Sequence, residues 1–226
     1  MFPRKSLLIL AAVVSTCGLF STATARSRHH DRDRIEGSSR LETRTFDLQG
    51  WDSLRLDGSM DIEVKVGDAH TASVKLDDNL FDNLVLEVRD GTLVVDWRKE
   101  CDADSQARLT LTAPSFVSLE INGAGDVKAD GFAGGEFGLR VRGAGDVELT
   151  GRVDDLDIRV DGAGDIDAAE LAARNVEVVI AGAGDVDVSA SESLDAAIQG
   201  AGDITYRGDP AKVQTKVAGV GGISRR

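Results

Sequence analysis

The tetrapeptide Gly123-Ala124-Gly125-Asp126 is the first of five identical copies in this chain of 226 residues. The later copies follow at intervals of 20, 19, 20 and 18 residues, and they begin at Gly143, Gly162, Gly182 and Gly200. A worn copy stands at residues 219–222, and an early one at residues 58–61. Self-similarity with a period near 20 residues is typical of a solenoid, in which each repeat buries its apolar edge against its neighbours.

Apolar residues alternate with polar ones on both sides of each copy. Around the first copy they are Val117, Leu119 and Ile121 before it, and Val127 and Ala129 after it. A period of two residues indicates strands rather than helices. Ile121 and Val127 are six positions apart, an even number, so both strands can point apolar side chains into one core. The sequence therefore predicts an all-β parallel β-helix with coils of 19–20 residues, each a strand, a tight corner, a shorter strand and a variable loop.

The corner residues have a structural and a functional interpretation. Glycine supplies positive φ, and we expect Asp to accept backbone amide hydrogen bonds. We expect the alanines to fill a column with no room for larger side chains, at Ala144, Ala163 and Ala183. The glycines of this structural motif are Gly123, Gly125, Gly143, Gly145, Gly162, Gly164, Gly182, Gly184, Gly200 and Gly202.

The functional alternative for the corner is a calcium site. A stacked fold places the corner aspartates in a ladder: Asp126, Asp146, Asp165, Asp185 and Asp203. Calcium-binding β-helices repeat every nine residues, whereas this period is twice as long and offers one Asp per corner. The sequence therefore favours the structural interpretation, with no metal and no cofactor. A dinucleotide loop does not fit either, because no copy has the third glycine of that motif.

The N-terminal residues have the order of a secretory signal peptide. Arg4 and Lys5 precede an apolar run over residues 6–20, and Ala23-Thr24-Ala25 supplies a cleavage site. The run is too short to span a membrane. We expect a signal peptide over residues 1–25, a disordered polar leader over residues 26–42 and a single β-helix domain over residues 43–224. The pair His29-His30 is interpreted as part of a solvated tether.

The net charge narrows the classes of possible partner, and the cysteine content decides whether a disulfide can form. Loss of Arg4 and Lys5 with the signal peptide changes the formal charge from −13 to −15. Such acidity argues against nucleic acid or an anionic membrane as the partner. Cys101 is then the one remaining cysteine, so no intramolecular disulfide forms, and its acidic neighbours disfavour a reactive thiolate.

The segment over residues 44–114 lacks the corner motif but keeps the strand pattern. Asp90-Gly91 lies between two alternating segments and predicts a hairpin turn with positive φ. A solenoid needs covered ends, because exposed strand edges pair with other chains. We interpret this irregular N-terminal portion as degenerate coils plus a cap.

Several short motifs accompany the repeated tetrapeptide: Phe46-Asp47, Trp51-Asp52, Gly58-Ser59-Met60-Asp61-Ile62, Asp77-Asp78-Asn79-Leu80, Gly91-Thr92-Leu93, Pro114 and Ile121. Together they resemble the putative auto-transporter adhesin, head GIN domain family of exported bacterial proteins. The resemblance covers roughly residues 43–223. It implies a right-handed parallel β-helix and brings no established activity.

The sequence favours a non-enzymatic role: an exported binding, adhesion or scaffold protein in the periplasm or at the cell surface. Residues near the corners vary between coils and could form a specific surface, at Asn122, Arg142, Asp161, Ala181 and Gln199. We expect an envelope or surface protein as partner, with a glycan or self-association through the solenoid ends as alternatives. A polysaccharide-active β-helix enzyme and a calcium-binding repeat protein are the competing functions. Carboxylates recur on every coil, which suits a solvated face better than a catalytic pair.

Overall fold

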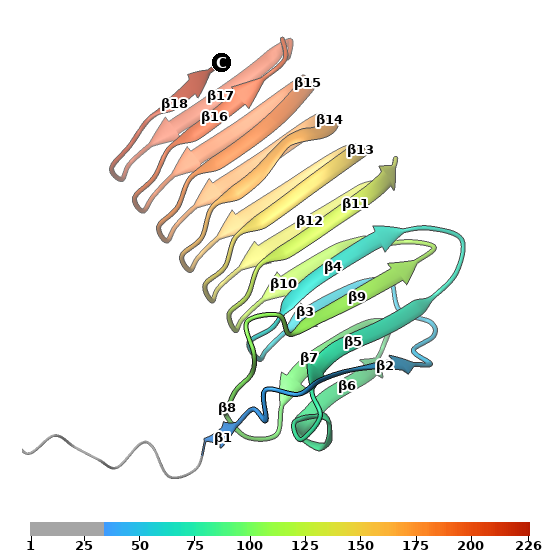
Figure 1. Cartoon of the computed structure of the whole chain (residues 1–226). Helices are drawn as coiled ribbons and strands as arrows, with labels where there is room; N and C mark the ends of the chain where they lie inside the picture. Colours follow the sequence, from blue (N-terminus) through green and yellow to red (C-terminus); the bar gives the residue numbers. More distant parts are fainter. Residues whose placement is uncertain (1–33) are drawn as a thin grey trace, which may run out of the picture. The chain divides into compact units, whose positions relative to one another are not determined.

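The computed structural model describes residues 34–226. The predicted signal peptide and the first part of the predicted leader, with His29 and His30, lie outside the described residues. Strands make up nearly all the regular structure of the described part, where one 3₁₀ turn, η1 (Phe81–Asn83), is the single helical element. Figure 1 shows the strands stacked as successive coils. The predicted all-β solenoid is confirmed.

Each coil contributes one strand before its corner and one after it. The strands before the corner include β3 (Ser53–Leu56), β10 (Ser118–Ile121) and β12 (Glu136–Val141). Those after the corner include β4 (Asp61–Val66) and β11 (Val127–Ala133). Strands of the same kind pair in parallel, and Leu54, Leu119 and Leu139 occupy one register position on three coils.

The middle coils have no separate loop between their strands, which differs from the predicted variable loop. The strand after one corner runs on into the strand before the next in β13 (Val147–Val160), β14 (Ile166–Ile180) and β15 (Val186–Ile198). Register shifts near Thr150 and between Ala168 and Ala172 absorb the differences in coil length as bulges. The predicted variable loop is present in other coils, where Gly134-Gly135 separates β11 from β12, and residues 208–211 separate β16 (Ile204–Arg207) from β17 (Lys212–Val217).

Columns of aliphatic side chains fill the solenoid interior. One column runs from Leu56 through Ile121 and Val141 to Ile198, and each of these four residues is completely buried. The column after the corner includes Ile62, Val127, Val147, Ile166, Val186 and Ile204. Burying an aliphatic side chain stabilises the fold by about 1.5–3 kcal/mol. Repeated over all coils, this burial is the main stabilising term of the described part of the chain.

The corners stack directly on one another along the solenoid. Single parallel bridges join Ser59, Ala124, Ala144, Ala163, Ala183, Ala201 and Val220 in that order. The early copy at residues 58–61 and the worn copy at residues 219–222 therefore lie in the same stack as the five intact copies. The interpretation of both as corners is confirmed.

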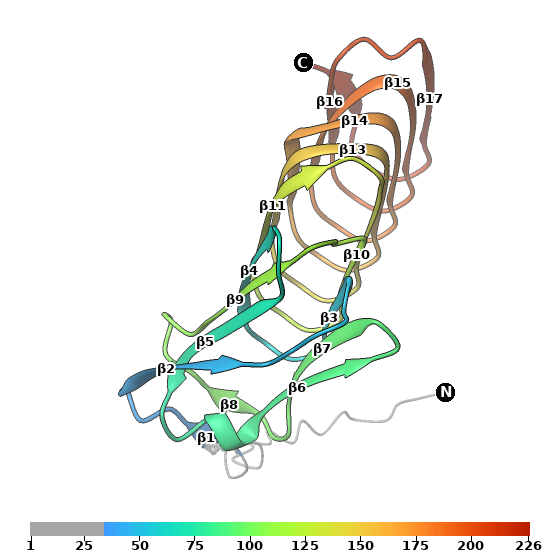
Figure 2. The same cartoon turned by 90° about the vertical axis from the view of Figure 1, so that its right-hand side faces the viewer.

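An antiparallel layer covers the N-terminal end of the solenoid (Figure 2). It contains β2 (Leu41–Phe46), β5 (Thr71–Asp77) and β6 (Leu84–Arg89), which join the coils through β9 (Arg108–Ala113) and β7 (Thr92–Trp97). Asp90 and Gly91 connect β6 to β7 with φ values of 50° and 79°, as the hairpin prediction requires. The interpretation of this segment as degenerate coils plus a cap is confirmed.

The predicted leader boundary is wrong for its last residues. Residues 34–42 were expected to be disordered, but β1 (Ile35–Glu36) pairs with β8 (Cys101–Asp102), and β2 already begins at Leu41. The reason is a set of buried and half-buried polar contacts that the composition of the segment does not reveal. Asp77 is completely buried and accepts the N–H groups of Ser39 at 2.7 Å and Asp104 at 2.8 Å.

Asn79 and Asp78 complete this attachment. Asn79 Nδ2 donates to the Glu36 carbonyl at 2.9 Å, and Asn79 Oδ1 accepts the N–H of Ser38 at 2.9 Å. Asp78 accepts a hydrogen bond from the Ser38 hydroxyl and pairs with Arg40. The motif Asp77-Asp78-Asn79 is therefore a clamp that holds the segment before β2 against the cap.

Candidate functional site

Each corner uses its two glycines because the coils approach too closely for any side chain there. A Cβ on Gly162 would lie 2.1 Å from the Gly143 carbonyl oxygen, and one on Gly164 would lie 2.1 Å from the Gly145 oxygen. Gly164 also has φ of 153°, which side-chain-bearing residues rarely adopt. The same approach of about 2 Å recurs at every intact corner. The glycines are thus required by packing between coils.

The alanine column is not cramped, and that prediction is wrong. Ala144, Ala163 and Ala183 are exposed, and Val220 at the same position of the worn copy is 75% exposed. The crowding falls on the glycines, while the alanine side chain between them points to solvent. Val220 shows that a larger side chain is accommodated at this position of the last corner.

The corner aspartates form a ladder of hydrogen bonds from coil to coil. Asp146 Oδ1 accepts the backbone N–H of Asp165 at 3.0 Å, and Asp165 Oδ1 accepts that of Asp185 at 2.9 Å. The ladder begins at Asp61, whose Oδ1 accepts the Asp126 N–H, and ends where Asp203 accepts the Gly222 N–H. One oxygen of each carboxylate thus joins its coil to the next. Among residues 34–226 no group of three or more His, Cys, Asp or Glu side chains is placed to hold a metal ion.

Ion pairs neutralise much of the charge on the outer faces of the early coils. Arg140 and Arg159 both contact Asp161 at 2.8 Å, and these hydrogen bonds hold the pKa of the Asp161 carboxyl below its usual value. On the strands after the corner, Lys128 contacts Glu148 at 2.6 Å, and Arg108 contacts Glu63 at 2.7 Å. Of the predicted variable surface, Asp161 is therefore engaged in holding neighbouring coils together.

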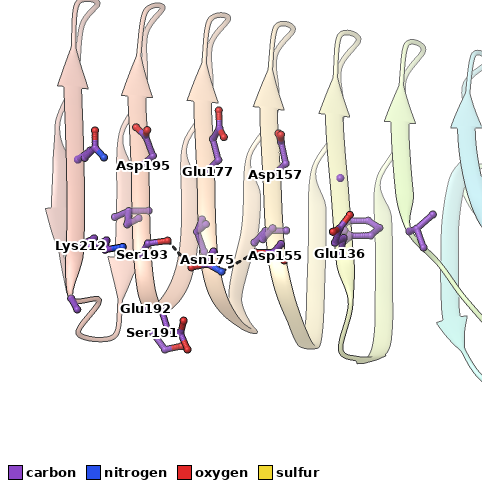
Figure 3. Close-up of a pocket in the computed structure, with 18 residues that line it drawn as sticks. Glu136, Asp155, Asp157, Asn175, Glu177, Ser191, Glu192, Ser193, Asp195 and Lys212 are labelled. Carbon is purple, nitrogen blue, oxygen red and sulfur yellow. Dashed lines mark hydrogen bonds between the residues drawn. The ribbon is translucent and has the colours of Figure 1, made fainter.

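A groove of about 1260 Å³ crosses the strands before the corners, from β12 to β17. Figure 3 shows its polar side chains in two rows that follow the solenoid axis. The groove lining includes six carboxylates and one cation: Glu136, Asp155, Asp157, Glu177, Glu192, Asp195 and Lys212. Its lining is strongly acidic.

The first row is linked by hydrogen bonds. Its members are in register from Glu136 to Asp155, Asn175, Ser193 and Lys212. Asn175 Nδ2 donates to Asp155 Oδ1 at 2.8 Å, and the Ser193 hydroxyl donates to Asn175 Oδ1 at 2.7 Å, as the dashed lines in Figure 3 show. These contacts fix the orientations of Asp155, Asn175 and Ser193.

The second row carries three carboxylates without such links. Asp157, Glu177 and Asp195 are in register on β13, β14 and β15, and all three are exposed. Within residues 34–226, no side-chain hydrogen bond or ion pair reaches any of them. Adjacent rungs of a sheet are about 4.8 Å apart. Two unit charges at that distance repel by roughly 0.9 kcal/mol in water. The row therefore costs stability, unlike the paired charges elsewhere.

Sequence reasoning missed this groove, because it assigned the carboxylates that recur on every coil to a solvated face. A signal was present, because each of the three carboxylates stands three residues before the last core residue of its strand: Val160, Ile180 and Ile198. Aligning the repeats on their corners would have found the row. The variable corner residues that were expected to form a surface lie elsewhere, because Asn122, Arg142, Asp161, Ala181 and Gln199 do not line the groove.

Cys101 and His70 both make contacts that hold the fold together. Cys101 is half-buried under β1, and burial raises the pKa of its thiol, which agrees with the predicted low reactivity. His70 Nε2 lies 2.8 Å from the Trp51 carbonyl oxygen, and its ring packs edge-on against the Trp51 indole. Neither residue lines the groove.

Stacked parallel coils, an aspartate ladder and an acidic groove define the class: a β-solenoid with an acidic face. The chain belongs to the family described as putative auto-transporter adhesin, head GIN domain, whose model matches residues 50–210. The resemblance inferred from sequence is therefore confirmed. No curated protein matches the chain.

Solved structures with the same fold come from Bacteroides and Parabacteroides species. A putative adhesin from Bacteroides fragilis has a TM-score of 0.70 and 24% identity, over 85% of this chain and 100% of that chain. A putative lipid binding protein from Parabacteroides distasonis has a TM-score of 0.55 and 26% identity, over 86% of this chain and 100% of its own. A putative adhesin from Parabacteroides merdae has a TM-score of 0.55 and 19% identity, over 86% and 99%. In residues 34–226, no helix has the length and apolar character needed to cross a membrane.

Proposed function

We propose that this chain is an exported, non-enzymatic binding protein of the cell envelope that holds a cationic segment of a protein partner in its acidic groove. Export rests on the order of charged, apolar and small residues over residues 1–25. Adhesion fits the family description and the descriptions of two of the similar structures. The single observation that carries the groove as the site is the unpaired carboxylate row Asp157, Glu177 and Asp195.

The row favours binding of a cationic group, because no cationic side chain within residues 34–226 pairs with its three carboxylates. Neighbouring outer positions of the same solenoid carry ion pairs, such as Lys128 with Glu148, so the fold can place counter-charges where stability alone matters. A bound cationic group would relieve the repulsion along the row and gain charge-assisted hydrogen bonds. Groups that cost stability in the free protein and gain it on binding are characteristic of functional sites.

The spacing of the carboxylates along the row favours an α-helical peptide as the bound segment. Coils repeat at about 4.8 Å along the axis, close to the 5.4 Å rise of one α-helical turn. A helix that lies along the groove and carries Lys or Arg on each turn would place one cation near each rung. Long, flexible Lys and Arg side chains absorb the small mismatch in spacing. Glycan binding is less well supported, because the one aromatic residue lining the groove, Phe137, is almost fully buried.

The competing enzyme function has one supporting feature, the close carboxylates of this row. Glycoside hydrolysis needs two carboxyl groups whose environments differ, so that one donates a proton while the other stays ionised. Asp157, Glu177 and Asp195 share the same exposed setting on successive coils. The row therefore suits binding better than acid–base chemistry.

The test is fluorescence anisotropy with a labelled helical peptide that carries one lysine per turn, at physiological salt. The triple variant Asp157→Asn/Glu177→Gln/Asp195→Asn should weaken binding at least tenfold. The matched control Asp68→Asn/Asp130→Asn/Asp187→Asn removes the same charge from carboxylates outside the groove and should bind within about twofold of the wild type. Equal weakening in both variants would reduce the interaction to net charge and reject the groove as the site.

The same triple variant should be more stable than the wild type. It removes two adjacent repulsions of roughly 0.9 kcal/mol each in water, reduced by salt screening, so a gain of about 1 kcal/mol in the free energy of unfolding is expected. Urea unfolding at low ionic strength measures the gain. A loss of stability would mean that the row contributes favourable contacts and has no need of a partner.

A further inference from the structure

The C-terminal coil leaves two strand edges without a partner in the described part of the chain. β17 pairs with β15 on one side only, and β18 (Ile223–Arg225) pairs with β16 on one side only. Both strands lie at the red end of the stack in Figure 1. Their outer backbone N–H and C=O groups are a ready template for one more strand.

The interior of this coil is also half open. Val213 and Val217 are 45% and 46% exposed, whereas Leu194 and Ile198, in register on β15, are almost completely buried. A strand added at β17 would continue both columns by placing apolar side chains at alternate positions. The edge therefore offers backbone hydrogen bonds together with apolar contact area.

The charge of this coil is opposite to that of the rest of the chain. The chain carries a formal charge of −13, yet residues 204–226 contain a single carboxylate, Asp209. The cations of the same segment are Arg207, Lys212, Lys216, Arg225 and Arg226. Lys216 is exposed, takes part in no ion pair within residues 34–226 and stands between Thr215 and Val217 on β17.

This charge decides which strand the edge accepts. A second copy paired edge to edge would bring its own Lys212 and Lys216 close to those of the first, and like charges across strands destabilise pairing. Lysines on an edge strand oppose self-association for this reason. An extended segment with carboxylates at alternate positions would instead form cross-strand ion pairs with them. The charge complementarity thus disfavours the second copy that the sequence suggested at the solenoid ends.

We propose that the outer edge of β17 is a docking site for an extended acidic segment of another protein, which adds a strand to the solenoid. Its apolar side chains would cover Val213 and Val217, and its carboxylates would lie beside Lys212 and Lys216. Backbone hydrogen bonds provide affinity in this mode of recognition, and alternate side chains provide specificity. The site adjoins the groove, because Lys212 lines the groove as well, whereas Val213, Lys216 and Val217 do not line it.

The test uses the purified chain and a peptide of alternating Val and Glu residues, followed by hydrogen exchange and anisotropy. Saturable binding with slower exchange over residues 212–217 is expected. Lys216→Glu should weaken binding at least tenfold, and the control Lys65→Glu, at an exposed lysine outside this coil, should not. A peptide methylated at alternate backbone nitrogens should also bind at least tenfold more weakly, because it lacks the N–H donors.

Other outcomes would overturn the proposal. Equal binding of the methylated peptide would mean that charge alone attracts it. Protection in the groove in place of β17 would assign the peptide to another surface. Concentration-dependent dimers with slower exchange over residues 212–217 in the absence of peptide would identify a second copy as the occupant. Binding to anionic vesicles with the same dependence on Lys216, in the absence of peptide binding, would identify a lipid surface.

Discussion

Gly164 and Ala163 are adjacent in one corner, but a side chain at Gly164 would contact the neighbouring coil, whereas the side chain of Ala163 lies in solvent. A Cβ on Gly164 would lie 2.1 Å from the Gly145 carbonyl oxygen, whereas the methyl group of Ala163 is exposed. Because the contact atom is backbone, the coil itself would have to shift to accept any side chain at Gly164. The identity of the repeated tetrapeptide is thus set by its glycines and aspartate, and its alanine is the least constrained member.

The first prediction compares substitutions at these two neighbours. Ala163→Leu should cost less than about 0.5 kcal/mol, because the side chain enters solvent. Gly164→Ala should cost about 2–5 kcal/mol, because it combines overpacking with a backbone conformation that favours glycine. Urea unfolding of both variants gives the comparison. Similar midpoints for the two variants would contradict the close approach of the coils at the glycines.

Asp165 provides the second prediction, which concerns the ladder. Asp165→Ala removes the acceptor of the Asp185 N–H and should cost about 1–3 kcal/mol, whereas Asp165→Asn keeps an acceptor and should cost less than half as much. Asp130→Ala, at an exposed carboxylate outside the ladder, is the control and should change stability by less than about 0.5 kcal/mol.

The effect of calcium on thermal stability distinguishes the structural interpretation of this ladder from a calcium site. Since one oxygen of each ladder carboxylate already accepts a backbone N–H, we propose that the fold needs no metal. Thermal melts with a chelator and with millimolar calcium should then coincide. A large calcium-dependent rise in Tm that Asp165→Ala abolishes would establish a metal site instead.

Among the elements, β1 and the segment before β2 depend most on a single side chain. Asp77 is completely buried and accepts two backbone N–H groups, from Ser39 and Asp104. Asp77→Ala would leave both donors without an acceptor, at an expected cost of about 2–4 kcal/mol. Hydrogen exchange over residues 35–40 should accelerate in this variant, and Asp68→Ala should leave it unchanged. Unaltered exchange over residues 35–40 would show that other contacts hold the segment.

The strands of the repeats could be predicted because the alternation of apolar and polar residues in each coil matches its pairing with the neighbouring coils. Each coil pairs with a near copy of itself, so the alternation in one coil reports the register of all of them. The hairpin at Asp90-Gly91 was equally readable, since its turn chemistry is local. The order of residues 34–42 was not readable, because it depends on contacts with Asp77 and Asn79, about forty positions away. The continuous strands β13 to β15 were missed because bulges replace the expected loops.

The candidate site was less predictable than the fold. Sequence reasoning examined the tetrapeptide because it is conspicuous, and its side chains prove to be occupied in holding coils together. The groove residues differ in type from coil to coil, as Asp155, Asn175 and Ser193 do at one register position. Only their distance from the corner is constant. Residues that bind a partner need not repeat, so a search for repeats passes over them.

At the scale of the whole described domain, charge is distributed unevenly along the solenoid. The groove over β12 to β15 is acidic, and the coil that follows is basic, which places two surfaces of opposite sign on one rigid scaffold. Continuous columns of buried side chains join the coils, so the acidic and the basic surface are held at a fixed distance from each other. This arrangement suits a protein whose function is to bind, and it requires no moving part.

The most direct test of the groove as the binding site is an amide NMR titration of the mature chain with the lysine-bearing helical peptide. The account predicts saturable shifts confined to strands β13, β14 and β15 around Asp157, Glu177 and Asp195, and their loss in the triple variant. Shifts centred on the aspartate ladder of the corners, or the absence of any saturable shift at the groove, would contradict it.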